Sequence, residues 1–343
     1  GGAELLTGKR ACGSVAAGRG VSIAEGAVCA TQWQLEECIA SMIDMTGAVI
    51  IKQDRHSGGF GNLIISRTAA TGALGPPEVL VARDDSQIRD QSRIAWTRLA
   101  YAERAPLIVE VYYPVTACLT AEFKVDAADN AVTFLNCGDV RQAPILSGLI
   151  MPSEVPPYQL ASFIADATEL ARLCCDLGYD GLVNIDGIVT SGGTVIINEF
   201  NGRIGGCSHI HRILESVAGP RYGDQLATVS HSPGTAMSID QVFGILDARK
   251  LAFDKGTGRG IVVTGEDAAD SGHLEYLSIA PSRAEAMRLE AEFEALLGAE
   301  AEPQSESGIE HLARILSHMP QVRRTEPEQT ARDRQRPGTA HQS

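Results

Sequence analysis

The spacing of hydrophobic and polar positions changes along the chain, which predicts helices and strands in a mixed α+β protein. Thr31 and Gln34 form a capping box, and an apolar stripe at helical spacing follows it over residues 35–43. A second apolar stripe predicts a helix over residues 159–177 that stops at Gly178. Short apolar runs predict strands over residues 48–51, 63–65 and 107–113. Further helices are predicted over residues 86–103 and after capping boxes at Ser238/Gln241 and Ser282/Glu285.

The sharpest pattern is a pair of strands that carry polar residues on one face. Side chains alternate along a strand, so Glu199, Asn201 and Arg203 point to the same side. A two-residue turn at Gly192-Gly193 is a favoured hairpin connection. It would place Asp186 opposite Glu199 and Asn184 opposite Asn201.

Facing carboxylates on one sheet repel each other, so the predicted pairing of Asp186 with Glu199 needs compensation. Oxygen ligands suit a hard cation such as Mg²⁺, which predicts a metal site on this hairpin. Ile185, Ile197 and Phe200 on the other face would anchor the hairpin to a core. The alternative is a solvent-facing polar side of an amphipathic hairpin, and a turn one residue longer would shift the pairing.

A lysine ends a buried strand just before a glycine-rich stretch. Lys52 precedes Ser57-Gly58-Gly59-Phe60-Gly61-Asn62, and another apolar strand follows. Glycines let backbone N–H groups approach phosphate oxygens closely, so the stretch can close over a nucleotide. It is neither a Walker motif nor a Rossmann turn, because no G-K-[ST] and no helix follow. A hairpin tip without a ligand is the competing interpretation.

Composition narrows the class of protein. The chain has 343 residues, enough for one large domain or two to three lobes, and a formal net charge of −14. That acidic balance argues against a dedicated nucleic-acid or acidic-membrane binder, since phosphates need clustered Lys and Arg. The eight cysteines contain no C-x-x-C pair, which favours reduced thiols in a cytoplasmic enzyme. No apolar run reaches the roughly 20 residues of a membrane span, and no signal peptide is visible.

Taken together, these segments resemble the ATP-grasp superfamily. The resemblance covers roughly residues 5–215, and the E-F-N-G-R-I-G-G run at its end is the most specific part. The matching residues are Lys9, Lys52, the Ser57–Asn62 stretch, Glu110, Asp186, Glu199, Asn201 and Arg203. Two later segments, Lys255–Gly260 and Leu274–Ala280, resemble the small C-terminal domain of pheganomycin-type peptide ligases.

The resemblance implies an ATP-grasp fold, in which two α+β lobes with antiparallel sheets clasp ATP and a small C-terminal α+β domain follows. We expect residues 1–46 to lead into the fold, with the family's N-terminal Rossmann-like domain largely missing from this chain. The expected divisions are 47–115 for the small lobe with its Gly-rich lid, 116–235 for the large lobe with the metal site, 236–300 for the C-terminal domain, and 301–343 for a helix and a disordered tail.

The same resemblance implies roles for single residues. Lys9 and Lys52 would hold the α- and β-phosphates of ATP, and Arg203 would stabilise the reacting acyl group. Asp186, Glu199 and Asn201 would bind Mg²⁺, with two ions expected. The further ATP contacts implied are Ser57, Gly58, Gly59, Phe60, Gly61, Asn62, Glu110, Val111 and Tyr112. No acidic residue for the ribose is obvious after Tyr113-Pro114, which leaves the ribose contacts open.

The implied reaction is ATP-dependent amide formation between a small carboxylic acid, such as a modified amino acid, and the amine of a peptide or amino acid. Such a ligase belongs to antibiotic biosynthesis. Arg141, Ser208 and His209 are candidate substrate contacts, although a surface ion pair for Arg141 and helix-start packing for His209 stay open. A dipeptide or D-amino-acid ligase, a small-molecule kinase and a non-catalytic nucleotide-binding scaffold are the alternatives. We expect no nucleic-acid or membrane partner, and a homodimer is one option for assembly.

Overall fold

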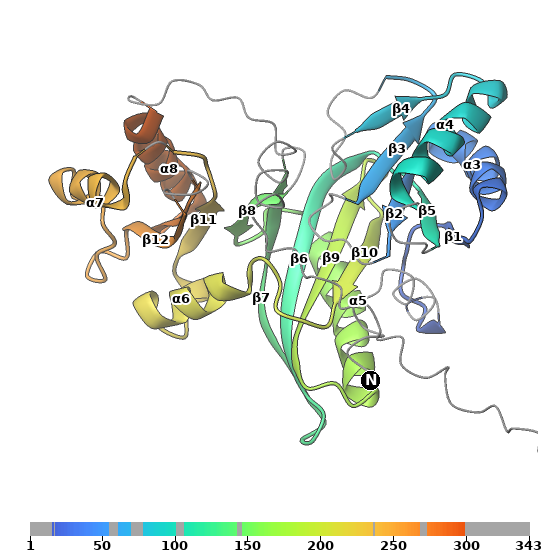
Figure 1. Ribbon diagram of the computed structural model, residues 1–343. Helices are drawn as coiled ribbons and strands as arrows, with labels where there is room; N and C mark the ends of the chain where they lie inside the picture. The colour runs from blue at the N-terminus through green and yellow to red at the C-terminus, as the bar shows by residue number, and fades with distance from the viewer. Residues whose placement is uncertain are drawn as a thin grey trace, which may run out of the picture. The chain divides into compact units, whose positions relative to one another are not determined.

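Two β-sheets organise the described residues of the protein (Figure 1). The computed structural model describes residues 16, 18–54, 61–69, 78–100, 106–142, 146–235, 237–267 and 273–298, which all belong to one compact unit. The predictions for Lys9 and for Ser57, Gly58, Gly59 and Phe60 lie outside the described residues. Among the helices that are described, none is both long and apolar enough to cross a membrane.

The smaller sheet has five strands in the order β1-β5-β2-β3-β4. Its pairs are antiparallel, as expected, and β3 with β4 adds one parallel pair at the edge. The helices α3 and α4 lie on one face of it (Figure 1). Both helices contribute apolar side chains to the core there. The strands are β1 (Gly26–Cys29), β2 (Ala48–Gln53), β3 (Asn62–Ser66), β4 (Val79–Val81) and β5 (Leu107–Val111), and the helices are α3 (Gln32–Thr46) and α4 (Asp85–Leu99).

Helix α3 forms where the sequence predicts it, although the Gln34 side chain accepts from the Ala30 amide and not from the Thr31 amide of a full capping box. The Thr31 side chain accepts a hydrogen bond from the Gln34 amide, and Gly47 ends the helix with a φ of 85°, which glycine adopts without strain. The predicted stripe faces the sheet, because Leu35, Ile39 and Ile43 are fully buried. Helix α4 begins at Asp85 and ends at Leu99, four residues before the expected end.

The larger sheet has eight strands in the order β10-β9-β6-β7-β8-β11-β13-β12, and all its pairs are antiparallel. The long central strands lie between the hairpin that carries the predicted metal ligands and the C-terminal strands. The strands are β6 (Val115–Asp126), β7 (Ala131–Gln142), β8 (Leu146–Met151), β9 (Gly181–Thr190), β10 (Val195–Asn201), β11 (Ala227–His231), β12 (Gly260–Asp267) and β13 (His273–Ala280).

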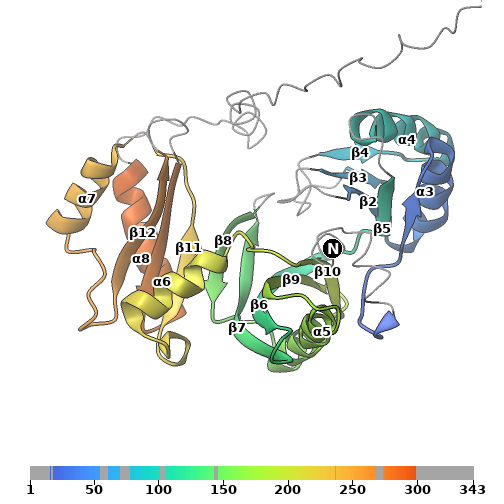
Figure 2. The same ribbon diagram turned by 60° about the horizontal axis from the view of Figure 1, so that its bottom comes forward.

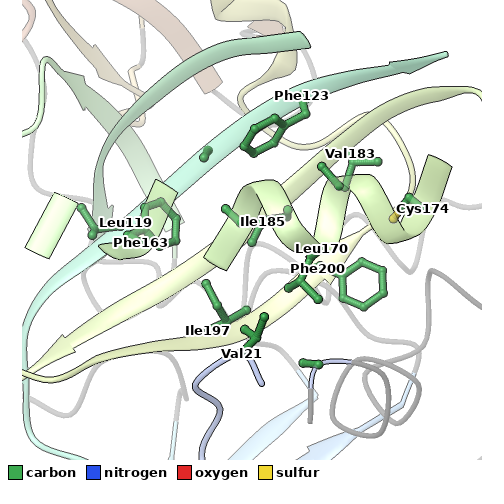
Figure 3. Close-up of a cluster of buried hydrophobic side chains, with 14 of the residues drawn as sticks. Val21, Leu119, Phe123, Phe163, Leu170, Cys174, Val183, Ile185, Ile197 and Phe200 are labelled. Atoms are coloured by element: carbon green, nitrogen blue, oxygen red, sulfur yellow. The ribbon is translucent and has the colours of Figure 1, made fainter. Parts of the chain in front are cut away.

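Helix α5 (Pro157–Asp176) covers one face of β6, β9 and β10 (Figure 2). Figure 3 shows the core beneath it, where Phe163 and Leu170 from α5 meet Ile185, Ile197 and Phe200 from the hairpin. These three hairpin residues are buried as predicted, so the opposite face of the hairpin is free for polar residues. A Cβ at Gly187 would lie 2.7 Å from the Phe163 ring, so glycine next to Asp186 permits this close packing.

The C-terminal strands do not form a separate sheet. β11 pairs with β8 on one side and β13 on the other, so the expected domain at 236–300 continues the sheet of the large lobe. Helix α8 packs on β11 and β13 (Figure 2). The capping box predicted for Ser238 is formed, and at Ser282 the hydroxyl accepts the expected hydrogen bond from the Glu285 amide. The remaining elements are α6 (Ser208–Ala218), the 3₁₀ turn Tyr222–Asp224, α7 (Ile239–Ala248) and α8 (Arg283–Gly298).

Candidate active site

A cavity of about 500 Å³ is lined by residues of both sheets. Strands β2 and β5 contribute side chains from the smaller sheet, and β6, β7, β9 and β10 from the larger one. The structure brings predicted site residues that are far apart in sequence to this one cavity. They are Lys52, Asn62, Glu110, Val111, Tyr112, Asp186, Glu199, Asn201 and Arg203.

Asp186 and Glu199 are direct neighbours across β9 and β10, as the sequence predicts. The predicted turn is wrong, however. Three residues, Ser191 to Gly193, form the turn: the Thr190 amide donates to the Thr194 carbonyl at 2.9 Å, and Gly193 has a φ of 83°. That longer turn shifts the pairing by one residue, and a bulge between Ile197 and Glu199 shifts it back. The bulge therefore restores the facing carboxylates.

The cavity side of the large sheet carries two parallel rows of polar residues. The first row runs across three strands through Thr120, Asp186 and Glu199. The second runs through Glu122, Asn184 and Asn201, one step further along each strand. The two rows are joined where the Asn184 amide donates to Thr120 Oγ1 at 2.9 Å.

The first row carries two neighbouring carboxylates, Asp186 and Glu199, and no cationic residue. Burial in the cavity wall, and after it the neighbouring Glu199 carboxylate, raises the pKa of Asp186 to about 7, although a Thr120 hydrogen bond and the Arg203 charge act in the opposite direction. Oxygen ligands on a patch of excess negative charge fit a hard divalent cation. Asp186, Glu199 and Asn201 therefore fit Mg²⁺, and Asn201 Oδ1 also accepts from Arg203 Nη2 at 3.1 Å.

Mg²⁺ binding is expected to release a proton in a pH-dependent way. With the pKa of Asp186 at about 7, binding at pH 6 should release about 0.9 proton and binding at pH 8 about 0.1. The apparent affinity should consequently fall by up to about tenfold per pH unit below pH 7 and level off above pH 8. Isothermal titration calorimetry in buffers of different ionisation enthalpy measures the release. Equal proton release at pH 6 and pH 8 would contradict the assignment.

Lys52 connects the two sheets at the cavity. Its ammonium group donates to Glu110 Oε2 at 2.5 Å and to the Asn198 carbonyl at 3.4 Å, and the residue is only 5% exposed. A buried ammonium group at this point supplies positive charge near the acidic row, where phosphate oxygens could bind. Gly61 and Asn62, the described end of the Gly-rich stretch, lie beside it, since Asn62 pairs with Lys52 across β2 and β3.

Two backbone N–H groups after Glu110 already donate hydrogen bonds within the protein. The Val111 amide donates to the Glu25 carbonyl at 2.8 Å, and the Tyr112 amide donates to the Ala48 carbonyl at 3.0 Å. The next residue, Tyr113, also lines the cavity. Adenine contacts by Glu110, Val111 and Tyr112 stay a prediction, and these two amides have protein acceptors already.

The loop after β10 carries Arg203 along the cavity wall. Arg203 donates to Asn201 Oδ1 and, at 3.0 Å, to the Ile204 carbonyl. Gly205 lies close over the second polar row, because a Cβ there would stand 3.0 Å from Asn184 Cγ. The guanidinium group is therefore held next to Asn201, where its charge also acts on Asp186, and its remaining N–H groups are able to bind an anion.

The three candidate substrate contacts have protein partners instead of places in the cavity wall. Ser208 is buried and donates to Glu122. His209 Nε2 lies 2.7 Å from Glu275 Oε1, and that hydrogen bond is the main reason why the pKa of His209 is raised. Arg141 forms an ion pair with Glu290. The ion-pair alternative for Arg141 thus matches the geometry better than a substrate contact.

Thr120 and Glu122 are site residues that the sequence reasoning missed. The strand around them alternates polar and apolar positions, with Leu119, Ala121 and Phe123 facing the core. That period of two marks Thr120 and Glu122 as sharing a face. The pattern does not show which strand lies beside them. The pairing of Thr120 with Asp186 and of Glu122 with Asn184 could therefore not be predicted from the sequence around them.

Solved structures with similar folds decide the architecture. An N5-carboxyaminoimidazole ribonucleotide synthetase with ADP matches with a TM-score of 0.59 at 15% identity, over 87% of this chain and 73% of that chain. Biotin carboxylase from Campylobacter jejuni, in a β,γ-ATP complex, matches with a TM-score of 0.59 at 13% identity, over 83% and 65%. The chain has the ATP-grasp fold. A third match is N5-carboxyaminoimidazole synthase from Aspergillus clavatus with ADP and 5-aminoimidazole ribonucleotide, with a TM-score of 0.57 at 12% identity, over 87% and 74%.

One family model, described as the PGM1 C-terminal domain, matches residues 241–293. That range adds α7, β12, β13 and part of α8 to the ATP-grasp fold, and it includes both later segments that resemble pheganomycin-type ligases. No curated protein matches the sequence.

Proposed function

We propose that the protein is an ATP-dependent ligase that activates a carboxylic acid and joins it to an amine. The observation that carries the proposal is the facing pair Asp186 and Glu199 in a cavity that also contains Lys52 and Arg203. This arrangement supplies acidic oxygens for a divalent ion and cations for phosphate in one place. The ADP and ATP-type complexes of proteins with the same fold support a nucleotide in this cavity.

The chemistry requires two anions, the substrate carboxylate and the triphosphate, to approach each other. A carboxylate oxygen attacks the γ-phosphorus, and the bond between that phosphorus and the β,γ-bridging oxygen breaks. ADP departs with the bridging oxygen, and the acid is now an acyl phosphate. An amine then attacks the acyl carbon, phosphate departs, and the amine loses a proton. When bound, Mg²⁺ supplies charge neutralisation at the phosphates, and Asp186, Glu199 and Asn201 would hold it.

Two cationic side chains would act on the substrates directly. Lys52 would bind phosphate oxygens as a point charge, sharing its ammonium group with Glu110. Arg203 would donate to the acyl phosphate and to the oxyanion that forms during amine attack. The predicted phosphate contacts of Lys9 and the Ser57–Asn62 stretch would complete the enclosure and exclude water from the acyl phosphate.

We infer that the amine belongs to a peptide and that the acid is a modified amino acid. Support comes from the sequence resemblance of Lys255–Gly260 and Leu274–Ala280 to pheganomycin-type peptide ligases, and both segments lie within the family match over residues 241–293. Fold alone does not set specificity in a fold that serves many reactions, so these substrates need a direct assay.

The assay is a panel of amino acids and modified acids with peptide amines, measured by phosphate release from Mg·ATP and by mass spectrometry of products. Hydroxylamine replaces the amine in parallel, because it traps an acyl phosphate as a hydroxamate. A ligase gives hydroxamate and amine-dependent ADP release. Phosphorylated alcohol without amine dependence would indicate a kinase and contradict the proposal, as would absent Mg·ATP binding.

Matched variants make the assay specific to the site. Glu199→Gln removes one predicted metal ligand, and Asp247→Asn changes an exposed acid on α7 in the same chemical way. We expect product formation to be lost in the first variant and unchanged in the second. Equal activity of the two variants would remove the facing carboxylates from the mechanism.

A further inference from the structure

Glu122 is a buried carboxylate that the reaction steps above do not use. It is 2% exposed and lies in the middle of β6, in the second polar row. Among the described residues, no Lys, Arg or His forms an ion pair with it. Burying a carboxylate without a cationic partner is unfavourable unless its hydrogen bonds compensate, so this position requires an explanation.

The hydrogen bonds of Glu122 lead to the first turn of α6. One carboxylate oxygen accepts from the Ser208 hydroxyl, and the other accepts from Asn136 Nδ2 at 3.4 Å. Ser208 Oγ in turn accepts from the Gly205 amide at 2.8 Å. The hydroxyl is thus used as donor and acceptor at once, and it fastens both the helix start and the loop before it to β6.

Helix α6 begins without a cap of its own. Cys207 occupies the N-cap position and makes no side-chain capping hydrogen bond. A negative charge near a helix N-terminus interacts favourably with the partial positive charge there. Glu122 is placed to supply that charge from another element, which accounts for a carboxylate at this site.

The loop fixed in this way is the one that carries Arg203. It leaves β10 at Asn201, passes over Asn184 at Gly205, and ends at Ser208. Neither Lys52 nor the Asp186–Glu199 pair depends on its far end for position, since those residues lie on strands. Loosening that end would therefore move Arg203 without moving the nucleotide contacts.

We propose that Glu122 is a positioning residue, whose bond to Ser208 holds the Gly202–Cys207 loop so that Arg203 meets the reacting acyl group. The inference rests on the proposed ligase function. Asp186, Glu199 and Asn201 would then serve the metal, whereas Glu122, in the same row as Asn201, holds the loop that presents Arg203. A misplacement of about 1 Å in a catalytic group can lower a rate by about a hundredfold.

The test uses the full chain with Glu122→Leu, which removes the carboxylate, and Ser208→Ala, which removes only the hydroxyl. Phosphate release with the acid and amine selected by the panel should fall by about 10- to 100-fold in both variants. The Kd for Mg·ADP should change by less than about threefold. Glu122→Gln keeps an acceptor for Ser208 and should restore most of the rate. Asp247→Asn, at an exposed acid on α7, is the control for the loss of one negative charge and should keep the wild-type rate.

Hydrogen exchange at the Gly205 amide gives a readout independent of turnover, because that amide donates to Ser208 Oγ. Its exchange should accelerate in Glu122→Leu and Ser208→Ala and keep the wild-type rate in Asp247→Asn. Unchanged exchange, a wild-type rate in both variants, or an equal loss of Mg·ADP affinity and rate would each overturn the positioning role. Wild-type protein that neither binds Mg·ADP nor releases phosphate would instead refute the ligase function itself, and the inference with it.

Discussion

Arg203→Ala is expected to lower kcat by at least about a hundredfold, with little change in the affinity for Mg·ADP. One oriented donor to a developing oxyanion contributes on the order of 3 kcal/mol. The structure places the Arg203 guanidinium beside the Asp186–Glu199 pair, where it donates to Asn201. It makes no ion pair with a carboxylate among the described residues, so its other donors can serve a substrate.

Single-turnover phosphate release and hydroxamate formation measure this effect. Arg203→Lys keeps the charge but loses the planar fork, so it should recover only part of the rate. Arg212→Ala removes an exposed arginine from the outer side of α6 and should leave the rate unchanged. A near-normal kcat for Arg203→Ala would exclude the residue from the reaction.

Asp186→Asn is expected to abolish Mg²⁺-dependent nucleotide binding and at the same time to stabilise the metal-free protein. Changing a residue that only supports a metal ligand already costs about 10- to 100-fold in metal affinity, so losing a ligand should cost at least about a hundredfold. The stability effect has the opposite sign, because the substitution removes the repulsion between two facing carboxylates.

The stability effect depends on pH in a defined direction. The pKa of Asp186 is raised to about 7 from an ordinary value of 3.8, so the folded protein binds the proton more tightly than the unfolded chain. The contribution of Asp186 to the free energy of unfolding therefore falls as pH rises from about 4 to about 7. Above pH 7 the Asn variant should melt a few degrees higher than wild type in EDTA.

Thermal melts in EDTA and in Mg²⁺ at pH 5 and pH 8 check both effects. The gain in melting temperature should be present at pH 8, should shrink at pH 5, and should be reversed by saturating Mg·ADP, which stabilises only the wild type. Asp247→Asn is the control for the loss of one acidic charge. A lower melting temperature for Asp186→Asn at pH 8 without metal would show that the carboxylates do not repel each other.

In the β9–β10 hairpin, the alternation of polar and apolar residues predicted the strand faces but not the turn. Alternation alone places Glu199 and Asn201 on one face and Ile185 and Phe200 on the other, and the structure confirms this division. The turn was not predictable in the same way. Two adjacent glycines fit both a two- and a three-residue turn, and the choice depends on strain spread over the whole hairpin. The bulge near Asn198 that corrects the register has no local sequence signal.

Partners from distant segments were the least predictable part of the site. Arg141 and Glu290 are 149 residues apart, and Ser208 and Glu122 are 86 apart. A sequence pattern states that such residues are polar and on a given face. It does not state which strand or helix will lie beside them, because strand order is set by the packing of the whole sheet.

The types of element, the buried face of each, and the lysines, acids and arginine available to the site could all be inferred from the amino-acid sequence. Those properties follow from periods of 2 and 3.6 residues and from side-chain chemistry, which are local. The folded chain was needed to see that Asp186 is buried against Glu199, that Lys52 shares its charge with Glu110, and that Glu122 contacts the start of α6. The physical reason is that burial, charge pairing and pKa depend on distances between segments, which exist only once the two sheets have folded around one cavity.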